Sequence, residues 1–261
     1  MTTTVFIDKQ TAIETPWLND VNTATYVTLP VTLPGAAGSS LVGYNALRTV
    51  QSKLGDFVSI LDYRVNTTPG VTDMTAALVA ALATGKSVYI PTGTYLITSA
   101  VTLGNAGQTV FGSGHLSVLQ QSTLAFDLFT ITADDVVVRD LRFNGAATSE
   151  ASGVLYWAIM VNAGKYVKII RCKFSGATAA DGWRSAIKYE TGANNGTVHD
   201  CEFERLWGSS APAVDCGYAI LAGAVIALYV SHCRAIGTAG RGRHMVIFQL
   251  LVGEHLLRLT V

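Results

Sequence analysis

Six residues in the second half of the chain have side chains that could carry out acid–base chemistry or bind a ligand. They are Asp181, Trp183, Arg184, Glu190, Trp207 and Asp215. Glycoside hydrolysis uses two carboxylates that lie about 5–5.5 Å apart when configuration is retained, or about 6.5–9.5 Å apart when it is inverted. Tryptophan rings can stack on the apolar faces of sugars. The three acidic residues are therefore catalytic candidates, and the two tryptophans with Arg184 are candidates for substrate binding.

Each of these acidic residues also has a purely structural interpretation. Aspartate is common in turns, where it accepts hydrogen bonds from its own backbone. A lyase mechanism would need a Ca²⁺ site built from several carboxylates and a basic residue that abstracts a proton. Arg171, Lys173 and Arg184 are the basic candidates, but no tight acidic cluster accompanies them. Hydrolysis is therefore favoured over elimination.

The remaining polar residues predict no metal site and no cofactor. Four histidines are scattered singly, which is typical of histidines with satisfied hydrogen bonds in a strand or loop: His199, His232, His244 and His255. Three acidic residues alternate with apolar positions and are expected on a solvated face: Asp140, Asp200 and Glu202. No spacing resembles a catalytic Ser-His-Asp set.

A repeated stretch must position these candidates. Its copies are 136–145, 167–176, 196–204 and 227–237, and they align on Leu141, Cys172, Cys201 and Cys233, about 30 residues apart. An aliphatic residue stands three places before each anchor: Val138, Ile169, Val198 and Val230. We interpret each copy as a short alternating strand followed by a turn. Such a period predicts a solenoid, with the three anchor cysteines stacked as a buried ladder rather than paired in disulfides.

Other elements extend the stack. A second strand is expected in each coil, over 128–131, 157–161, 185–189, 217–221 and 244–248. Earlier, residues 87–97 predict two short strands broken by a Pro-Thr-Gly turn. A helix is expected over 72–83, with Thr72 or Asp73 as its N-cap and Gly85 at its end.

The composition of the chain excludes several classes of protein. The chain has 261 residues, 49% of them hydrophobic and only 14% charged, and its formal net charge is +0. A nucleic-acid-binding protein would need a basic surface, and a disordered chain would be more polar. The N-terminal residues lack the basic and apolar regions of a signal peptide, so we expect none. The uncharged run 216–233 matches the repeat, so we expect no membrane span.

Two motifs resemble a known family. Val88-Tyr-Ile-Pro-Thr-Gly-Thr-Tyr-Leu-Ile97 after the expected helix, and Val110-Phe-Gly-Ser-Gly114, resemble the start of pectate-lyase-like right-handed parallel β-helices. Residues 38–63, with Gly38-Ser-Ser-Leu-Val-Gly43 and Val58-Ser-Ile-Leu-Asp-Tyr63, resemble the junction before the β-helix in bacteriophage tail spikes. The resemblance implies an all-β, right-handed parallel β-helix with an N-terminal capping α-helix and a short attachment segment.

The same resemblance implies an organisation and partners. Residues 1–37 would attach to virion tail proteins, 38–70 would form a neck, and 71–261 would be a β-helix truncated at its C-terminus. Such spikes are typically homotrimers of the virion that bind or depolymerise bacterial surface polysaccharide. Two alternatives remain: a secreted pectate-lyase-like polysaccharide lyase or hydrolase, and a non-catalytic adhesin fragment of a spike.

Overall fold

The computed structural model describes residues 50–123, 125–146, 156–176, 185–204, 218–236, 246–250 and 257–260, together with 183 and 206. The chain divides into two compact units, Met1–Asp56 and Phe57–Val261. In the first unit the described residues contain helix α4 (Val50–Leu54). The expected attachment segment, residues 1–37, lies outside the described residues.

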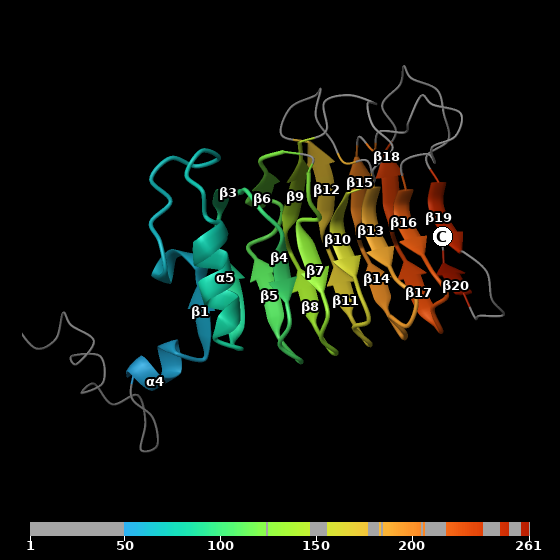
Figure 1. Cartoon of the computed structure of the whole chain (residues 1–261), viewed down its shortest axis with the longest axis horizontal. Helices are drawn as coiled ribbons and strands as arrows, with labels where there is room; N and C mark the ends of the chain where they lie inside the picture. Colours follow the sequence, from blue (N-terminus) through green and yellow to red (C-terminus); the bar gives the residue numbers. More distant parts are fainter. Residues whose placement is uncertain are drawn as a thin grey trace, which may run out of the picture. The chain divides into compact units, whose positions relative to one another are not determined.

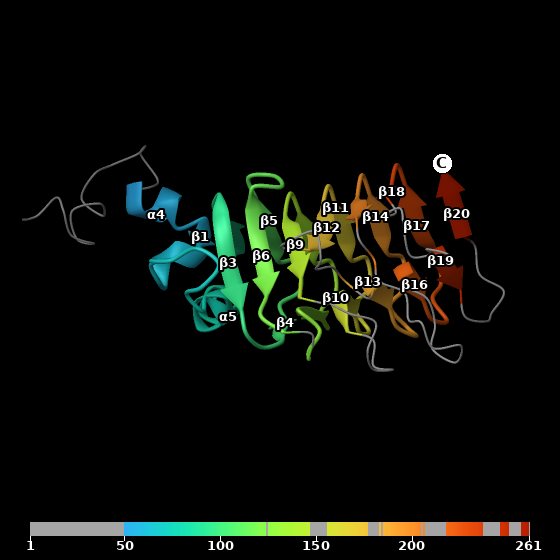
Figure 2. The same cartoon turned by 90° about the horizontal axis from the view of Figure 1, so that it is seen from above.

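The second unit is a parallel β-helix with three sheets (Figure 1 and Figure 2). Sheet I contains β1 (Phe57–Ser59), β2 (Ser87–Ile90), β5 (Thr109–Gly112), β8 (Val137–Arg139), β11 (Lys168–Ile170), β14 (Thr197–His199), β17 (Leu228–Ser231) and β20 (Leu257–Thr260). Sheet II contains β3 (Gly93–Ile97), β6 (Ser117–Gln121), β9 (Arg142–Gly145), β12 (Lys173–Gly176), β15 (Glu202–Glu204) and β18 (Arg234–Ile236). Sheet III contains β4 (Val101–Leu103), β7 (Phe129–Ile131), β10 (Trp157–Val161), β13 (Ser185–Tyr189), β16 (Tyr218–Ala222) and β19 (Val246–Leu250).

The strand register confirms the predicted repeat. In sheet I, Val138 pairs with Ile169, Ile169 with Val198, and Val198 with Val230, and each pair is parallel. All four side chains are buried in the core enclosed by the three sheets. One inward aliphatic residue per coil therefore fixes the register, because a slip of one residue would turn the apolar side chains outward.

The anchor cysteines form the expected ladder. The thiols of Cys172, Cys201 and Cys233 each donate to the carbonyl oxygen two residues earlier, at 3.4 Å in all three coils. All three are free. Burial raises the pKa of the Cys201 thiol well above its ordinary value. These thiols are therefore packing groups, as predicted.

One feature of the repeat differs from the prediction. The stretch that we interpreted as one strand is two strands, one in sheet I and one in sheet II, joined at a sharp bend. At successive bends, Asp140, Arg171, Asp200 and His232 have φ between 49° and 58°. Side chains other than glycine rarely adopt this left-handed conformation, so the pattern of apolar residues gives no sign of it. Asp140 and Asp200 thus lie in bends rather than within strands.

The helix that covers the first coil is α5 (Thr75–Ala83), which starts later than expected. Its N-cap is Met74, because Asp73 and Met74 still pair with β3: the Met74 amide donates to the Leu96 carbonyl at 2.8 Å. The Asp73 carboxylate accepts from the Thr75 amide at 2.9 Å. Gly85 follows the helix with φ 71°, as predicted. A 3-10 helix, η2 (Ile60–Asp62), precedes it, and among the described residues no helix is long and apolar enough to cross a membrane.

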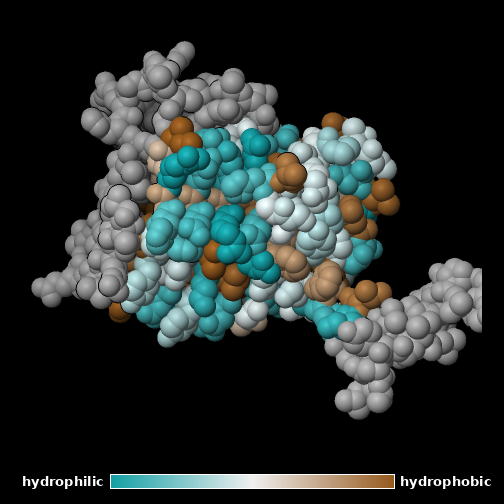
Figure 3. Space-filling view, turned by 180° about the vertical axis from the view of Figure 1, so that it is seen from behind, coloured by the Kyte–Doolittle hydropathy of each residue, from teal (hydrophilic) through white to brown (hydrophobic). Residues whose placement is uncertain are grey.

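The outer face of sheet II has ion pairs between coils. The Lys173 ammonium lies 2.6 Å from the Glu202 carboxylate and 2.9 Å from that of Glu204, and Arg234 lies 2.6 Å from Glu202. The described part of the face shown in Figure 3 is largely hydrophilic. Burial opposes the ionisation of Glu202, but the hydrogen bonds from Lys173 and Arg234 outweigh it and lower the pKa of its carboxyl to about 2.

This ion pairing predicts a stability that depends on pH. The folded-state pKa of Glu202 lies below the ordinary value of 4.5, so its contribution is complete above about pH 4.5 and is lost as the pH falls through about 2. We expect Glu202→Gln to lower the free energy of unfolding by roughly 1–3 kcal/mol at pH 7. Urea denaturation at several pH values measures this difference. A gap between variant and wild type that stays constant down to pH 2 would contradict it.

Candidate active site

The described residues include two of the six predicted site residues, Trp183 and Glu190. Asp181, Arg184, Trp207 and Asp215 lie outside them. In chain order these four fall in the connections from β12 to β13 and from β15 to β16. Both connections run from a strand of sheet II to a strand of sheet III.

Trp183 has a structural role. Its side chain is fully buried in the core, and its indole N–H donates to the Phe143 carbonyl at 3.0 Å. Its backbone forms a parallel bridge with Leu206 in the next coil. The ring that was expected to stack on a sugar therefore packs against protein, because the bridge turns it inward.

Glu190 directly follows β13 and forms an ion pair with Lys188. These two residues alternate with the buried Tyr189, so both side chains point away from the core. Lys188 aligns with Met160 in β10 and with Leu221 in β16, which places it on the outer face of sheet III. About a third of the Glu190 side chain is exposed to solvent.

A second carboxyl group, Asp127, lies two residues before β7. Its Oδ1 atom accepts a hydrogen bond from the Trp157 amide at 2.7 Å. Burial raises the pKa of the Asp127 carboxyl above its ordinary value, and the negative charge of Glu190 raises it further. The hydrogen bond from the Trp157 amide and the positive charge of Lys188 lower the same pKa, but by less. Asp127 and Glu190 are therefore close enough to interact electrostatically, with Lys188 acting on both.

Apolar side chains accompany these charges. Trp157, Leu221 and Met160 form a small cluster separate from the main core. The Lys188 ammonium lies 5.7 Å from the centre of the Trp157 ring, within the range of a cation–π interaction. We call Asp127, Trp157, Lys188 and Glu190 the sheet III cluster.

The sheet III cluster combines groups suited to acid–base chemistry. A carboxyl group with a raised pKa keeps its proton to a higher pH and can donate it to a leaving oxygen. A second carboxylate nearby can act as base or nucleophile. The Lys188 ammonium, which forms an ion pair with Glu190, can bind an anionic sugar substituent. The arrangement suits the hydrolysis of a glycosidic bond.

The sequence alone identified Glu190 but not Asp127 or Lys188. Asp127 stands alone in the sequence, 30 residues from the tryptophan whose amide it binds. Its position in the repeat could have identified it. Asp127 comes just before the expected strand 128–131, as the loops that contain Asp181 and Asp215 come before the expected strands 185–189 and 217–221.

Comparison with known proteins agrees with this architecture. The model of the rhamnogalacturonase A/epimerase, pectate lyase-like family matches residues 57–217, more than half of the chain. The chain belongs to this family. Its parallel β-helix is therefore pectate lyase-like, as the motifs at 88–97 and 110–114 predicted. No curated protein matches the sequence.

Solved structures share this pectate lyase-like fold at low sequence identity. The tailspike protein of E. coli bacteriophage HK620, solved with a hexasaccharide, gives a TM-score of 0.58 at 16% identity, covering 78% of this chain and 41% of that one. The Dettilon tailspike protein gives 0.51 at 15% identity, covering 78% and 38%. DFA-IIIase from Arthrobacter chlorophenolicus, solved with DFA-III, gives 0.50 at 11% identity, covering 70% and 58%. This chain thus spans about two fifths of the length of either tailspike.

Proposed function

We propose that this chain is part of a bacteriophage tail spike that binds bacterial surface polysaccharide and hydrolyses it at the sheet III cluster. The observation that carries the proposal is the electrostatic interaction between two carboxyl groups, Asp127 with its raised pKa and Glu190, beside strands of sheet III in a pectate lyase-like β-helix. The resemblance of residues 38–63 to the spike junction supports it. So does the fold shared with two tailspike proteins, one of them solved with a hexasaccharide.

In the proposed mechanism Asp127 is the general acid. Its protonated carboxyl donates to the glycosidic oxygen as the bond to the anomeric carbon breaks. Glu190 either attacks that carbon directly, forming a glycosyl-enzyme that water then hydrolyses with Asp127 as the base, or removes a proton from a water molecule that attacks the carbon. Lys188 orients Glu190 through their ion pair and contacts an acidic substituent of the glycan. Arg184 and Trp207 stay candidates for glycan binding, and Asp181 and Asp215 stay catalytic candidates, in the connections before β13 and β16.

The test is to incubate purified protein with capsule, O-antigen or exopolysaccharide from candidate hosts. We expect shorter chains by size-exclusion chromatography, new reducing ends and no unsaturated product. The anomeric configuration of the first product, followed by NMR, then distinguishes direct attack by Glu190 from attack by water. Unsaturated uronates would instead indicate a lyase. Binding without shortening would indicate a non-catalytic adhesin and would overturn the hydrolytic step.

Lys188 gives a prediction about pH. Its positive charge lowers the pKa of Asp127, so Lys188→Met should raise that pKa. A general acid works while protonated, so the alkaline limb of the kcat profile should move to higher pH. Measuring kcat across pH for this variant, with the exposed Lys168→Met as control, tests the role of Asp127. An alkaline limb that stays in place would argue against it.

In this proposal the chain assembles as a homotrimer and residues 1–37 join it to virion tail proteins. The low charge content of 14% supports burial between copies. So do large apolar side chains exposed on the described surface, including Leu116 and Ile226. Light scattering should give about three times the chain mass of 27.6 kDa. A monomeric mass would contradict the trimer without affecting the hydrolytic proposal.

A further inference from the structure

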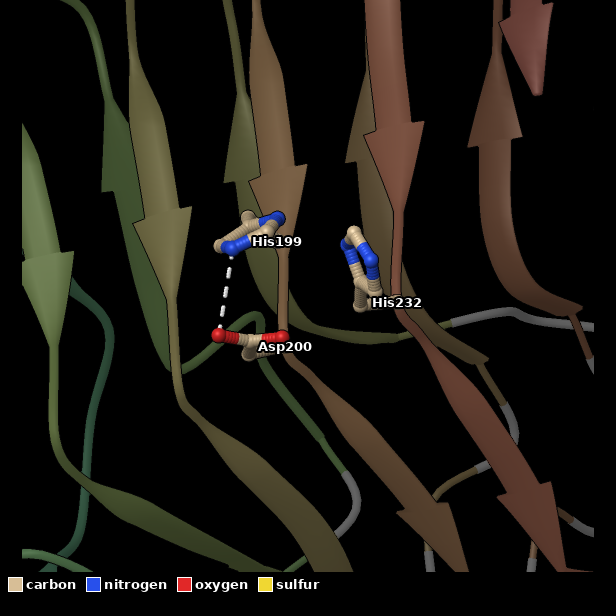
Figure 4. A group of neighbouring side chains, drawn as sticks. All are labelled: His199, Asp200 and His232. Atoms are coloured by element: carbon tan, nitrogen blue, oxygen red, sulfur yellow. Dashed lines mark ion pairs between the residues drawn. The ribbon is translucent and has the colours of Figure 1, made fainter. Parts of the chain in front are cut away.

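Two histidines and an aspartate that are scattered in the sequence meet on the surface of the β-helix (Figure 4). His199 is the last residue of β14, Asp200 occupies the bend that follows, and His232 occupies the equivalent bend after β17. Each offers one ligand atom, and the three atoms lie within 4.8 Å of one another. The group therefore joins two adjacent coils.

The backbone fixes the spacing of this group. Asp200 and His232 both have φ 52°, so they stack one coil apart in the same left-handed bend. The equivalent bends of the two preceding coils hold Asp140 and Arg171. These two residues pair with each other, since Arg171 donates to both carboxylate oxygens of Asp140 at 2.6 and 2.9 Å. Cys233 takes no part, because its thiol donates to the Ser231 carbonyl at 3.4 Å.

The distances suit a metal ion with nitrogen and oxygen ligands. His199 Nε2 lies 3.1 Å from Asp200 Oδ2. With metal–ligand bonds of about 2.0–2.2 Å, neighbouring ligand atoms lie roughly 2.8–3.1 Å apart in octahedral coordination and roughly 3.3–3.6 Å apart in tetrahedral coordination. Moving the His232 ring closer completes the set, and that side chain is exposed. Imidazole ligands favour zinc and related transition metals over calcium, which prefers oxygen.

A hydrogen bond outside the group positions one ligand. His199 Nδ1 lies 2.7 Å from the Ser231 hydroxyl. The tautomer that donates from Nδ1 leaves the lone pair of Nε2 directed toward Asp200. Metal-bound histidines nearly always have such a partner on the second ring nitrogen. The His199 and His232 rings meet edge to face, with centroids 5.1 Å apart.

We propose that His199, Asp200 and His232 bind a divalent transition-metal ion, with Zn²⁺ as the representative, and that the ion clamps two adjacent coils together. Three protein ligands leave coordination positions for water. The ion would stabilise the folded chain because the unfolded chain does not hold the three ligands together. This site does not depend on the proposed hydrolysis, because its residues lie at the bends between sheets I and II rather than on sheet III.

The test is calorimetric titration of the untagged, metal-free full chain with ZnCl₂ at neutral pH. We expect one ion per chain, and a higher melting temperature when zinc is present. His232→Ala should weaken binding at least about tenfold, and Ser231→Ala, which keeps all three ligands, by about tenfold to a hundredfold. The matched control is His115→Ala, an exposed histidine between β5 and β6, which should bind like the wild type.

Thermal melting without metal shows whether each variant folds. If His232→Ala does not fold, Asp200→Asn keeps the shape of the bend and serves in its place. Unchanged zinc affinity in the folded variants would overturn the proposal. The absence of zinc binding by the wild type, or an equal loss of affinity in His115→Ala, would also overturn it.

Discussion

The Asp127→Asn and Glu190→Gln variants are each expected to cleave the host polysaccharide about 10²–10⁴-fold more slowly than the wild-type chain. Asparagine can still accept the hydrogen bond from the Trp157 amide through its side-chain oxygen, so the fold around β10 should remain. It has no carboxyl proton to donate to the leaving oxygen. Glutamine keeps the size of Glu190 but is neither nucleophile nor base. The loss should therefore appear mainly in kcat.

The matched control for these variants is Glu204→Gln. Glu204 is a similarly exposed glutamate that also pairs with a lysine, Lys173, but on sheet II. Glu204→Gln should leave the cleavage rate within about twofold of wild type, although it removes one glutamate–lysine ion pair, as Glu190→Gln does. Initial rates are measured by reducing-end release, and circular dichroism checks folding. If Asp127→Asn and Glu190→Gln both cleave at the rate of this control, the reaction does not use the sheet III cluster.

The sequence predicts the fold well because the inward residues of a β-helix recur at nearly constant spacing. Val138, Ile169, Val198 and Val230 identify the register, since the core admits one apolar residue at that position in every coil. The bend after each of these strands is not visible in the same pattern. A left-handed conformation usually suggests glycine, and three of the four bends hold aspartate or histidine instead.

The sites are harder to predict because each combines residues from different coils. Asp127 gains its raised pKa from burial beside a strand that lies one coil further on. His199 and His232 appear unrelated until the register places them on adjacent bends. For Trp183 the sequence suggested a site residue that the structure does not place in a site. Its acidic neighbours in the sequence suggested an exposed ring, but the ring is buried. The spacing of residues along the chain therefore predicts the β-helix, whereas the chemistry of a site depends on which side chains meet between neighbouring coils.

The Phe174→Ala variant is expected to lower the free energy of unfolding by about 3–5 kcal/mol. Phe174 is fully buried in β12 between two other phenylalanines. Its ring centre lies 5.2 Å from that of Phe143 and 5.1 Å from that of Phe203, with the planes within 9° of parallel in both cases. Alanine removes the middle of this stack and leaves a cavity between two fixed coils. That loss is a large part of the 5–15 kcal/mol that stabilises a typical domain.

Tyr229→Ala provides the control, because this aromatic residue of β17 is 41% exposed and its removal should cost less than about 0.5 kcal/mol. Urea denaturation measures the free energy of unfolding of both variants, and hydrogen exchange shows which strands lose amide protection. Since each coil of a solenoid depends mainly on its neighbours, protection in Phe174→Ala should fall first in β9, β12 and β15 and least in β3. Equal losses in the two variants would mean that the phenylalanine stack does not hold these coils together.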